Sequence, residues 1–199
     1  MTSSSQKKTI GILTSGGDCP GLNAVIRSVT KAANRRGWDL LGFTDGYEGL
    51  LDPVRYRKLD SSNTAGILTL GGTILGTVNK GRFAAKVGEG EVRQIDSEIL
   101  NEAKQTCERL GLSGLVCIGG DGSLTIAQQL FDLGVPVVGV PKTIDNDLEA
   151  TAATFGFDSA VASATDALDR LHSTAESHRR VFVLEVMGRH AGWIATYSG

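Results

Sequence analysis

The stretch LVCIGGDGS at residues 115–123, followed by VPVVGVPKTIDND at residues 135–147, decides the fold of this chain. Each half begins with a continuous apolar run, which is typical of parallel strands covered by helices on both faces. Between them, Ser123 to Leu133 has helical spacing. The stretch therefore predicts a strand, a helix and a second strand. Its polar loops leave the carboxyl ends of the strands, where open α/β sheets bind ligands.

The same alternation of strands and helices recurs along the chain. Strands are predicted at residues 9–14, 38–43 and 181–186, and helices at residues 24–36, 91–110 and 159–174, with the first turns of another helix at the end. This pattern predicts a three-layer α/β sandwich with a mostly parallel sheet, made of one nucleotide-binding lobe and the start of a second. We expect one domain over residues 1–199, with the polar residues 1–8 as a disordered tail.

Composition argues against several classes of function. The chain has 199 residues, of which 41% are hydrophobic and 21% charged, as in ordinary soluble proteins. A net charge of -2 without a long basic cluster argues against a nucleic-acid partner. No apolar run suggests a membrane span or a signal peptide, so a cytoplasmic location is expected. Cys19, Cys107 and Cys117 lack metal-ligand spacing and are expected to be reduced structural thiols.

Glycine is unusually frequent, with 26 residues. Three pairs, Gly16–Gly17, Gly71–Gly72 and Gly119–Gly120, stand at predicted strand ends. Any one pair could be a tight turn, but three pairs at one sheet edge favour a polyanion site lined by main-chain amides. The chain lacks the Walker lysine motif and the full GxGxxG spacing. Tyr47, in another glycine-flanked loop, could stack on a base or simply pack within the loop.

Acidic residues follow the glycine-rich turns. Phosphoryl transfer needs amides and cations around the phosphates, a carboxylate for Mg²⁺ and a base for the accepting hydroxyl. Asp121, expected in a tight turn beside Gly122, is the candidate Mg²⁺ ligand. Asp145 and Asp147 stand on the next loop, where one carboxylate can act as the base. The alternative for this Asp-Asn-Asp segment is a calcium-like or turn-forming surface loop.

Five segments together resemble the phosphofructokinase family in order and spacing. They are residues 13–24, 71–73, 119–123, 143–147 and 185–189. The resemblance implies a Mg²⁺-dependent 6-phosphofructokinase of glycolysis, which transfers a phosphoryl group from ATP to the 1-hydroxyl of fructose 6-phosphate. It also implies a homo-oligomer, because members of this family act as homotetramers.

The resemblance further implies three sets of site residues. The nucleotide set is Gly17, Asn79, Lys80, Gly120, Asp121, Gly122 and Ser123, and Asp121 also holds the metal. The catalytic set is Thr143, Asp145 and Arg189, with Asp145 as the base for the sugar hydroxyl. The substrate set is Thr143, Ile144, Asp145, Arg180, Met187, Gly188 and Arg189, and Arg180 would reach the 6-phosphate bound by a neighbouring subunit.

Three departures from the family pattern leave alternatives open. Asn79 replaces a phosphate-contacting arginine of many ATP-dependent members, so that only Lys80 or Arg82 could substitute for it. Lys142 is typical of pyrophosphate-dependent relatives, but Gly122 is the ATP-type residue and leaves room for an α-phosphate, which favours ATP. Family members also continue well past residue 199. We therefore expect a C-terminally truncated chain, which could be a nucleotide-binding module without full activity.

Overall fold

The protein consists of two compact units, Met1–Pro141 and Lys142–Gly199. The computed structural model describes residues 7–78, 81–83, 94–149 and 151–199. Each unit has its own cluster of buried apolar side chains. A single domain over residues 1–199 remains a prediction.

A mostly parallel sheet forms the centre of the first unit, with its strands in the order β3-β2-β1-β4-β5. The strands are β1 (Thr9–Thr14), β2 (Asp39–Phe43), β3 (Tyr56–Leu59), β4 (Leu112–Gly119) and β5 (Val137–Thr143). β1 pairs in parallel with β2 and β4, and β4 pairs in parallel with β5. Among the strands of the described residues, only β3 is antiparallel to its neighbour, β2. The predicted parallel sheet is confirmed.

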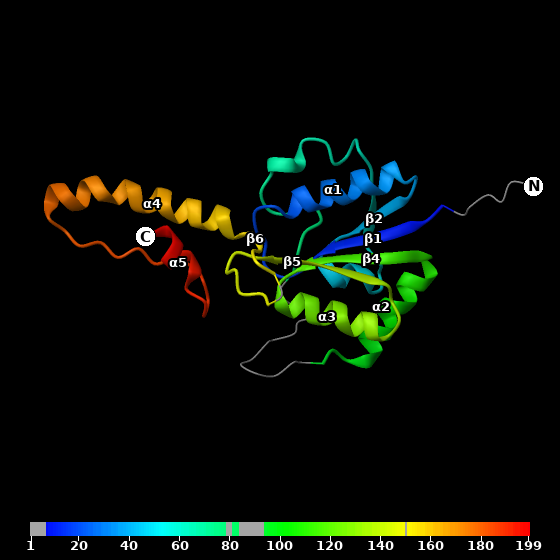
Figure 1. The fold of residues 1–199 in the computed structure, drawn as a ribbon. Coiled ribbons are helices and arrows are strands. Elements are labelled where there is room, and N and C mark those ends of the chain that lie inside the picture. Colours follow the sequence, from blue (N-terminus) through cyan, green and yellow to red (C-terminus); the bar gives the residue numbers. More distant parts are fainter. Residues whose placement is uncertain (1–6, 79–80, 84–93, 150) are drawn as a thin grey trace, which may run out of the picture. The chain divides into compact units, whose positions relative to one another are not determined.

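Helices cover both faces of this sheet. Figure 1 shows α1 (Leu22–Arg35) on one face, and α2 (Ser97–Arg109) and α3 (Asp121–Asp132) on the other. Two short 3-10 helices, η1 (Gly46–Leu50) and η2 (Ile67–Thr69), lie in the connections. The buried core includes apolar side chains from β1, β4 and α3, namely Leu13, Leu115, Cys117, Ile126 and Leu130. These layers confirm the predicted α/β sandwich.

Some helix boundaries differ from the predictions because local caps decide them. α2 begins at Ser97, since the carboxylate of Asp96 accepts a hydrogen bond of 2.8 Å from the amide of Glu98. Residues 91–93 of the predicted helix lie outside the described residues. α3 begins at Asp121 with Gly120 as its N-cap, so Asp121 and Gly122 belong to the first helical turn and not to a separate tight turn.

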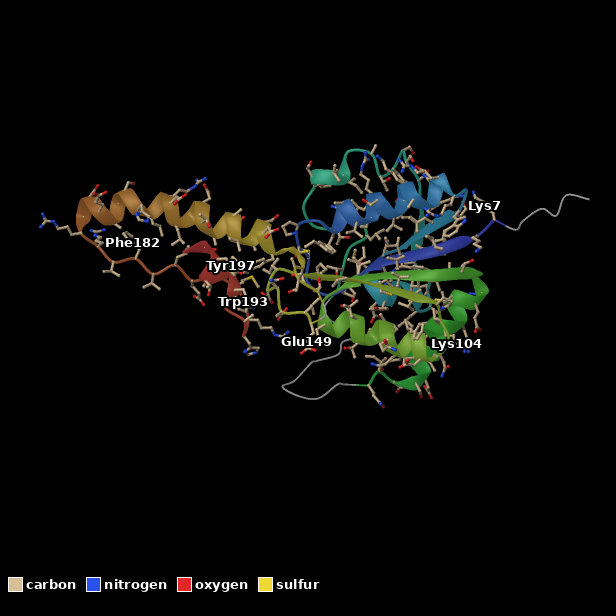
Figure 2. The ribbon with its side chains drawn as sticks, in the orientation of Figure 1. Lys7, Lys104, Glu149, Phe182, Trp193 and Tyr197 are labelled. Carbon is tan, nitrogen blue, oxygen red and sulfur yellow. The ribbon has the colours of Figure 1, made fainter. Side chains whose placement is uncertain are left out.

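The second unit begins at the end of β5, where Lys142 and Thr143 pair in parallel with β6 (Phe155–Gly156). The long helix α4 (Phe157–His178) follows, and α5 (Trp193–Ser198) packs on it. Figure 2 shows Trp193 and Tyr197 on α5, and the ring centroids of Tyr197 and Phe157 are 5.5 Å apart. The predicted helix at the end of the chain is confirmed, and α4 is longer than the predicted residues 159–174.

The predicted strand at residues 181–186 is wrong. This segment runs back along α4 without regular secondary structure (Figure 1), and Val181 and Val183 are 94% and 92% exposed. A strand needs a neighbour to pair its main-chain N–H and C=O groups, and no described residue of the second unit pairs with this segment. The prediction that β5 is covered on both faces is also incomplete, because Val138 is 62% exposed.

Lys7 and Lys8, the last two residues of the expected tail, are tied to β2. Residues 1–6 of the expected tail lie outside the described residues. The ammonium of Lys7 is 2.8 Å from the carboxylate of Asp39, and the amide of Asp39 donates to the carbonyl oxygen of Lys8 at 2.9 Å. Among the described helices, none combines the length and the apolar character needed to cross a bilayer.

Candidate functional site

The carboxyl ends of β1 and β4 meet where the strand order reverses. From β1 the chain continues to β2 on one side, while β4 lies on the other side of β1. Ligands bind at such a switch point in open α/β sheets. The amide of Ser15 donates to the carbonyl oxygen of Ile118 at 2.9 Å, so the turns that leave these two strands are held together.

These two turns pack so closely that they require glycine. A Cβ atom on Gly119 would lie 2.3 Å from the Cβ of Ser123, which excludes a side chain there. A Cβ atom on Gly16, which has φ +84, would lie 3.3 Å from the Oγ of Ser123. Ser123 is buried in this contact, whereas Gly17 and Asp121 remain exposed. The structure therefore brings the Gly16–Gly17 turn beside the turn that begins α3.

The N-terminus of α3 offers main-chain donors and one carboxylate. The first helical bond runs from the amide of Leu124 to the carbonyl oxygen of Gly120, so the three preceding amides have no partner within the helix. Such amides, with the positive end of the helix dipole, suit a phosphate. The exposed carboxylate of Asp121 forms no ion pair with any described residue.

Asp121 fits Mg²⁺ as a single protein ligand. Within the described ranges, no group of three or more His, Cys, Asp or Glu side chains could hold a metal. Mg²⁺ commonly takes only one or two carboxylates and completes its shell with phosphate oxygens and water. The exposed carboxylate of Asp121 supplies one such oxygen, and the adjacent helix amides would bind the phosphate that supplies others.

The Gly71–Gly72 pair is held near the start of α1 by the side chain of Asn23. Its amide donates to the carbonyl oxygens of Leu70 at 2.9 Å and Gly71 at 3.2 Å, and its Oδ1 accepts from the amide of Ile74 at 2.8 Å. This pair does not follow a strand as predicted, since the segment before it contains η2. The role of Asn23 depends on partners about 50 residues away, so sequence reasoning did not single it out.

The cationic candidates of the first unit are only partly described. Asn79 and Lys80 lie outside the described residues. Arg82 forms an ion pair with α2, because its guanidinium is 2.7 Å from the carboxylate of Glu102. The next residue, Phe83, donates its amide to Oε1 of Glu48 at 3.0 Å. Arg82 is therefore paired with α2, and its role as a substitute for a phosphate-contacting arginine remains a prediction.

In the second unit, the loop after β5 carries the predicted base. Oδ1 of Asp145 is buried and has no hydrogen-bond partner among the described residues. Burial and the charge of Asp147 raise the pKa of the Asp145 carboxyl, while Arg189, Lys142 and the hydroxyl of Thr143 oppose that rise. A carboxylate with a raised pKa and an unused oxygen is suited to accept a proton.

The second unit separates Arg180 from the loop of Asp145. Ile144 packs against the apolar cluster of the unit, which contains Phe157 at the start of α4. Arg180 is exposed just beyond the other end of this helix, whose 22 residues span about 33 Å. Arg189, by contrast, lies within electrostatic reach of Asp145.

The neighbours of Arg189 form a turn. Gly188 is buried with φ +149, and its carbonyl oxygen accepts a hydrogen bond of 3.1 Å from the amide of Ala191. Arg189 itself has φ +51 and is exposed, as is Met187. Of the substrate set, the structure thus groups Thr143, Asp145 and Arg189 and leaves Arg180 apart.

The chain matches known proteins over nearly its whole length. The family model for phosphofructokinase matches residues 9–199. The chain is 55% identical to an ATP-dependent 6-phosphofructokinase of Chloroflexus aggregans, covering 98% of this chain and 54% of that protein. It thus spans about half the length of the curated relatives it matches.

Two solved structures share the fold. Phosphofructokinase from Saccharomyces cerevisiae has a TM-score of 0.80 and 34% identity, and the match covers 95% of this chain and 27% of that one. Pyrophosphate-dependent phosphofructokinase from Marinobacter aquaeolei has a TM-score of 0.73 and 25% identity, over 96% of this chain and 49% of that one.

Proposed function

The chain belongs to the phosphofructokinase family, and on that premise we propose that it takes part in Mg²⁺-dependent phosphoryl transfer from ATP to the 1-hydroxyl of fructose 6-phosphate. The observation that carries the proposal is the buried Oδ1 of Asp145, which lacks a hydrogen-bond partner among the described residues. The name of the relative from Chloroflexus aggregans, an ATP-dependent 6-phosphofructokinase, supports the same reaction.

The proposal assigns the donor phosphates to residues of the first unit. The amides at the start of α3, from Gly120 to Ser123, would bind them, as helix N-termini bind anions. Gly17 would contribute on the family resemblance. Asp121 would hold Mg²⁺, which when bound neutralises charge on the donor phosphates. Asn79 and Lys80 stay in the nucleotide set on the family resemblance alone.

The proposal assigns the acceptor to residues of the second unit. Oδ1 of Asp145 accepts the proton of the sugar 1-hydroxyl while the oxygen of that hydroxyl bonds to the γ-phosphorus. The bond from phosphorus to the bridging oxygen of the leaving ADP breaks in the same transfer. Arg189 would offset the negative charge, and Thr143 and Ile144 would line the transfer site. Met187 and Gly188 would contact the sugar phosphate.

ATP is the proposed donor. Gly122 lies in the first turn of α3 and adds no carboxylate beside a nucleotide phosphate. The ATP-dependent relative is 55% identical to the chain, whereas the pyrophosphate-dependent structure is 25% identical. Lys142, the pyrophosphate-type residue, is 6% exposed, and its positive charge lowers the pKa of Asp145. Its burial supports a role beside the base more than a role in choosing the donor.

Rates with ATP and with pyrophosphate, measured at equal Mg²⁺ and fructose 6-phosphate, test the proposal. We expect turnover with ATP and loss of turnover in Asp145→Ser, with nucleotide binding nearly intact. Turnover retained by Asp145→Ser would remove the assigned base, and faster turnover with pyrophosphate would reverse the donor assignment.

A second candidate is a nucleotide-binding module without full turnover. It is favoured by the N-terminus of α3 and Asp121, which lie in the first unit and could bind a nucleotide without the acceptor residues of the second. Assay of the 199-residue chain beside an extended gene product separates the two candidates. Nucleotide binding without turnover in the short chain would support the module, and full turnover would exclude it.

The proposal includes a homo-oligomer in the cytoplasm. Arg180 is exposed beyond the end of α4 that lies away from Phe157, where it could contact substrate bound by a neighbouring subunit. Light scattering, which gives the oligomeric state, and steady-state kinetics, which give KM, test this role in Arg180→Ala. We expect an oligomer with a raised KM for fructose 6-phosphate, and a monomer with unchanged KM would contradict the assignment.

A further inference from the structure

The loop that carries Asp145 is closed by a residue from its far end. The hydroxyl of Thr154, one residue before β6, donates to the carbonyl oxygen of Thr143 at 2.7 Å in a buried hydrogen bond. The amide of Thr154 donates to Oδ1 of Asn146 at 3.0 Å. Thr154 therefore contacts the chain on both sides of Asp145.

The backbone turns sharply just after Asp145. Asn146 has φ +52, in the left-handed region, which asparagine adopts more readily than most residues other than glycine. The amide of Asp145 points back and donates to Oγ1 of Thr143 at 3.1 Å. The side chain of Asn146 accepts from the amide of Thr154, so the residue that closes the loop through its hydroxyl also holds this turn.

This arrangement keeps Oδ1 of Asp145 buried although no described residue bonds to it. A buried oxygen without a partner is unfavourable, and a loop free to rotate would expose it to water. Neither Thr154 nor Asn146 belongs to the catalytic or substrate residues assigned above, and buried Thr154 is placed to act through the loop.

We propose that Thr154 and Asn146 are positioning residues that fix the direction of the Asp145 carboxylate toward the acceptor hydroxyl. The inference rests on the proposed function for its chemistry, but the loop geometry can be tested separately. Proton transfer requires the base within hydrogen-bond reach, and a displacement of about 1 Å can cost about 100-fold in rate.

Thr154→Val removes the hydroxyl and keeps the shape of the side chain. We expect kcat to fall about 10-fold to 100-fold, while KM for ATP changes less than about 2-fold. Thr154→Ser keeps the hydroxyl and should restore most of the rate. If Thr154 had a purely structural role, Thr154→Val would lower the yield of folded protein but would not lower kcat while leaving KM for ATP unchanged.

A second measurement does not depend on turnover. The carboxyl pKa of Asp145 can be followed by carbon NMR in the whole chain, where Asp147, Arg189 and Lys142 act on it in parent and variant alike. If Thr154→Val releases the loop, water reaches the carboxyl and its pKa falls toward the ordinary value. Thr154→Ser should keep the raised pKa.

Two further variants isolate the contact. Asn146→Gly permits the left-handed backbone and removes the side-chain acceptor of the Thr154 amide, so it should act like Thr154→Val and replaces it if that variant does not fold. Thr151→Val is the matched control, because Thr151 donates to the carbonyl oxygen of Ala153 at 3.0 Å in the same loop. It should change neither kcat nor the pKa of Asp145.

The outcomes separate the two proposals. An unchanged pKa of Asp145 in both Thr154→Val and Asn146→Gly would overturn the positioning role. If these variants lower the pKa of Asp145 but the parent chain has no kinase activity, the positioning role is supported and the proposed reaction is contradicted.

Discussion

The hydroxyl of Tyr47 donates a hydrogen bond of 2.7 Å to the main-chain carbonyl oxygen of Ser123. Tyr47 lies in η1, after β2, whereas Ser123 lies in the first turn of α3. The bond therefore ties a distant connection to the turn that presents Asp121. The ring of Tyr47 is 1% exposed and its centroid is 5.3 Å from that of Phe83, so the side chain packs and does not offer a free face to a base.

Tyr47→Phe should lower the free energy of unfolding by about 1 kcal/mol, because a buried hydrogen bond is lost while the ring remains. Urea denaturation measures the change. Tyr56→Phe is the control, since Tyr56 is 44% exposed, and it should stay within about 0.5 kcal/mol of the parent. Equal effects of the two changes would contradict the importance of the bond.

Gly119→Ala should destabilise the protein by about 1–3 kcal/mol, because its Cβ would overlap the side chain of Ser123. It should also weaken nucleotide binding, measured by calorimetry. Gly114→Ala on the same strand is the matched control. Its Cβ would lie 3.6 Å from the nearest atom, the carbonyl oxygen of Pro136, so no loss is expected. Similar losses at both glycines would refute the close packing at Gly119.

Asn23→Ala should lower the free energy of unfolding by about 2 kcal/mol or more, because three main-chain groups lose their partner. Thermal and urea denaturation measure this cost. Asn34→Ala removes an exposed hydrogen bond of 2.9 Å to Ser61 from the same helix and should cost less than about 0.5 kcal/mol. If the two costs were equal, Asn23 would not organise the Gly71–Gly72 segment.

Asp145→Asn should stabilise the protein at about pH 7. The folded state raises the pKa of this carboxyl above its unfolded value of about 3.9, so ionisation opposes folding as the pH rises through the folded pKa. The gain from Asn should shrink as the pH falls toward the unfolded pKa, because the folded parent takes up its proton more readily than the unfolded chain does. Urea denaturation across this range measures the gain.

Asp169→Asn, an exposed carboxylate on α4, is the control for this pH series and should change stability by less than about 0.5 kcal/mol. A gain from Asp145→Asn that is the same at about pH 4 and about pH 7 would show that the raised pKa is not its cause.

The three cysteines should react slowly with a thiol reagent in the native protein. All are buried without a disulfide, as the composition predicts for structural thiols. Burial raises the pKa of Cys107 to about 11 and of Cys117 to about 12, so at about pH 8 roughly one thousandth or less of each is thiolate. All three should react once the chain is denatured, and fast native labelling of Cys107 or Cys117 would contradict this.

Local patterns in the sequence predicted most of the elements and the family, but not the short strands β3 and β6. The strand at Thr9–Thr14 was predicted to the residue, and the unit around residues 115–140 was predicted with shifts of a few residues. These signals are local, because hydrophobic period and glycine turns depend on residues close in the chain. The same local signal failed at residues 181–186, because a strand also depends on a neighbour.

The tertiary structure alone decided which turns meet and which side chains hold them. The sequence predicts strands at residues 9–14 and 115–118 without stating that they pair, yet that pairing brings Gly16 against Ser123. Asn23, Tyr47 and Thr154 bond to partners 47, 76 and 11 residues away. Such contacts leave no period in the sequence, since they follow from how packed elements meet and not from any local conformational preference.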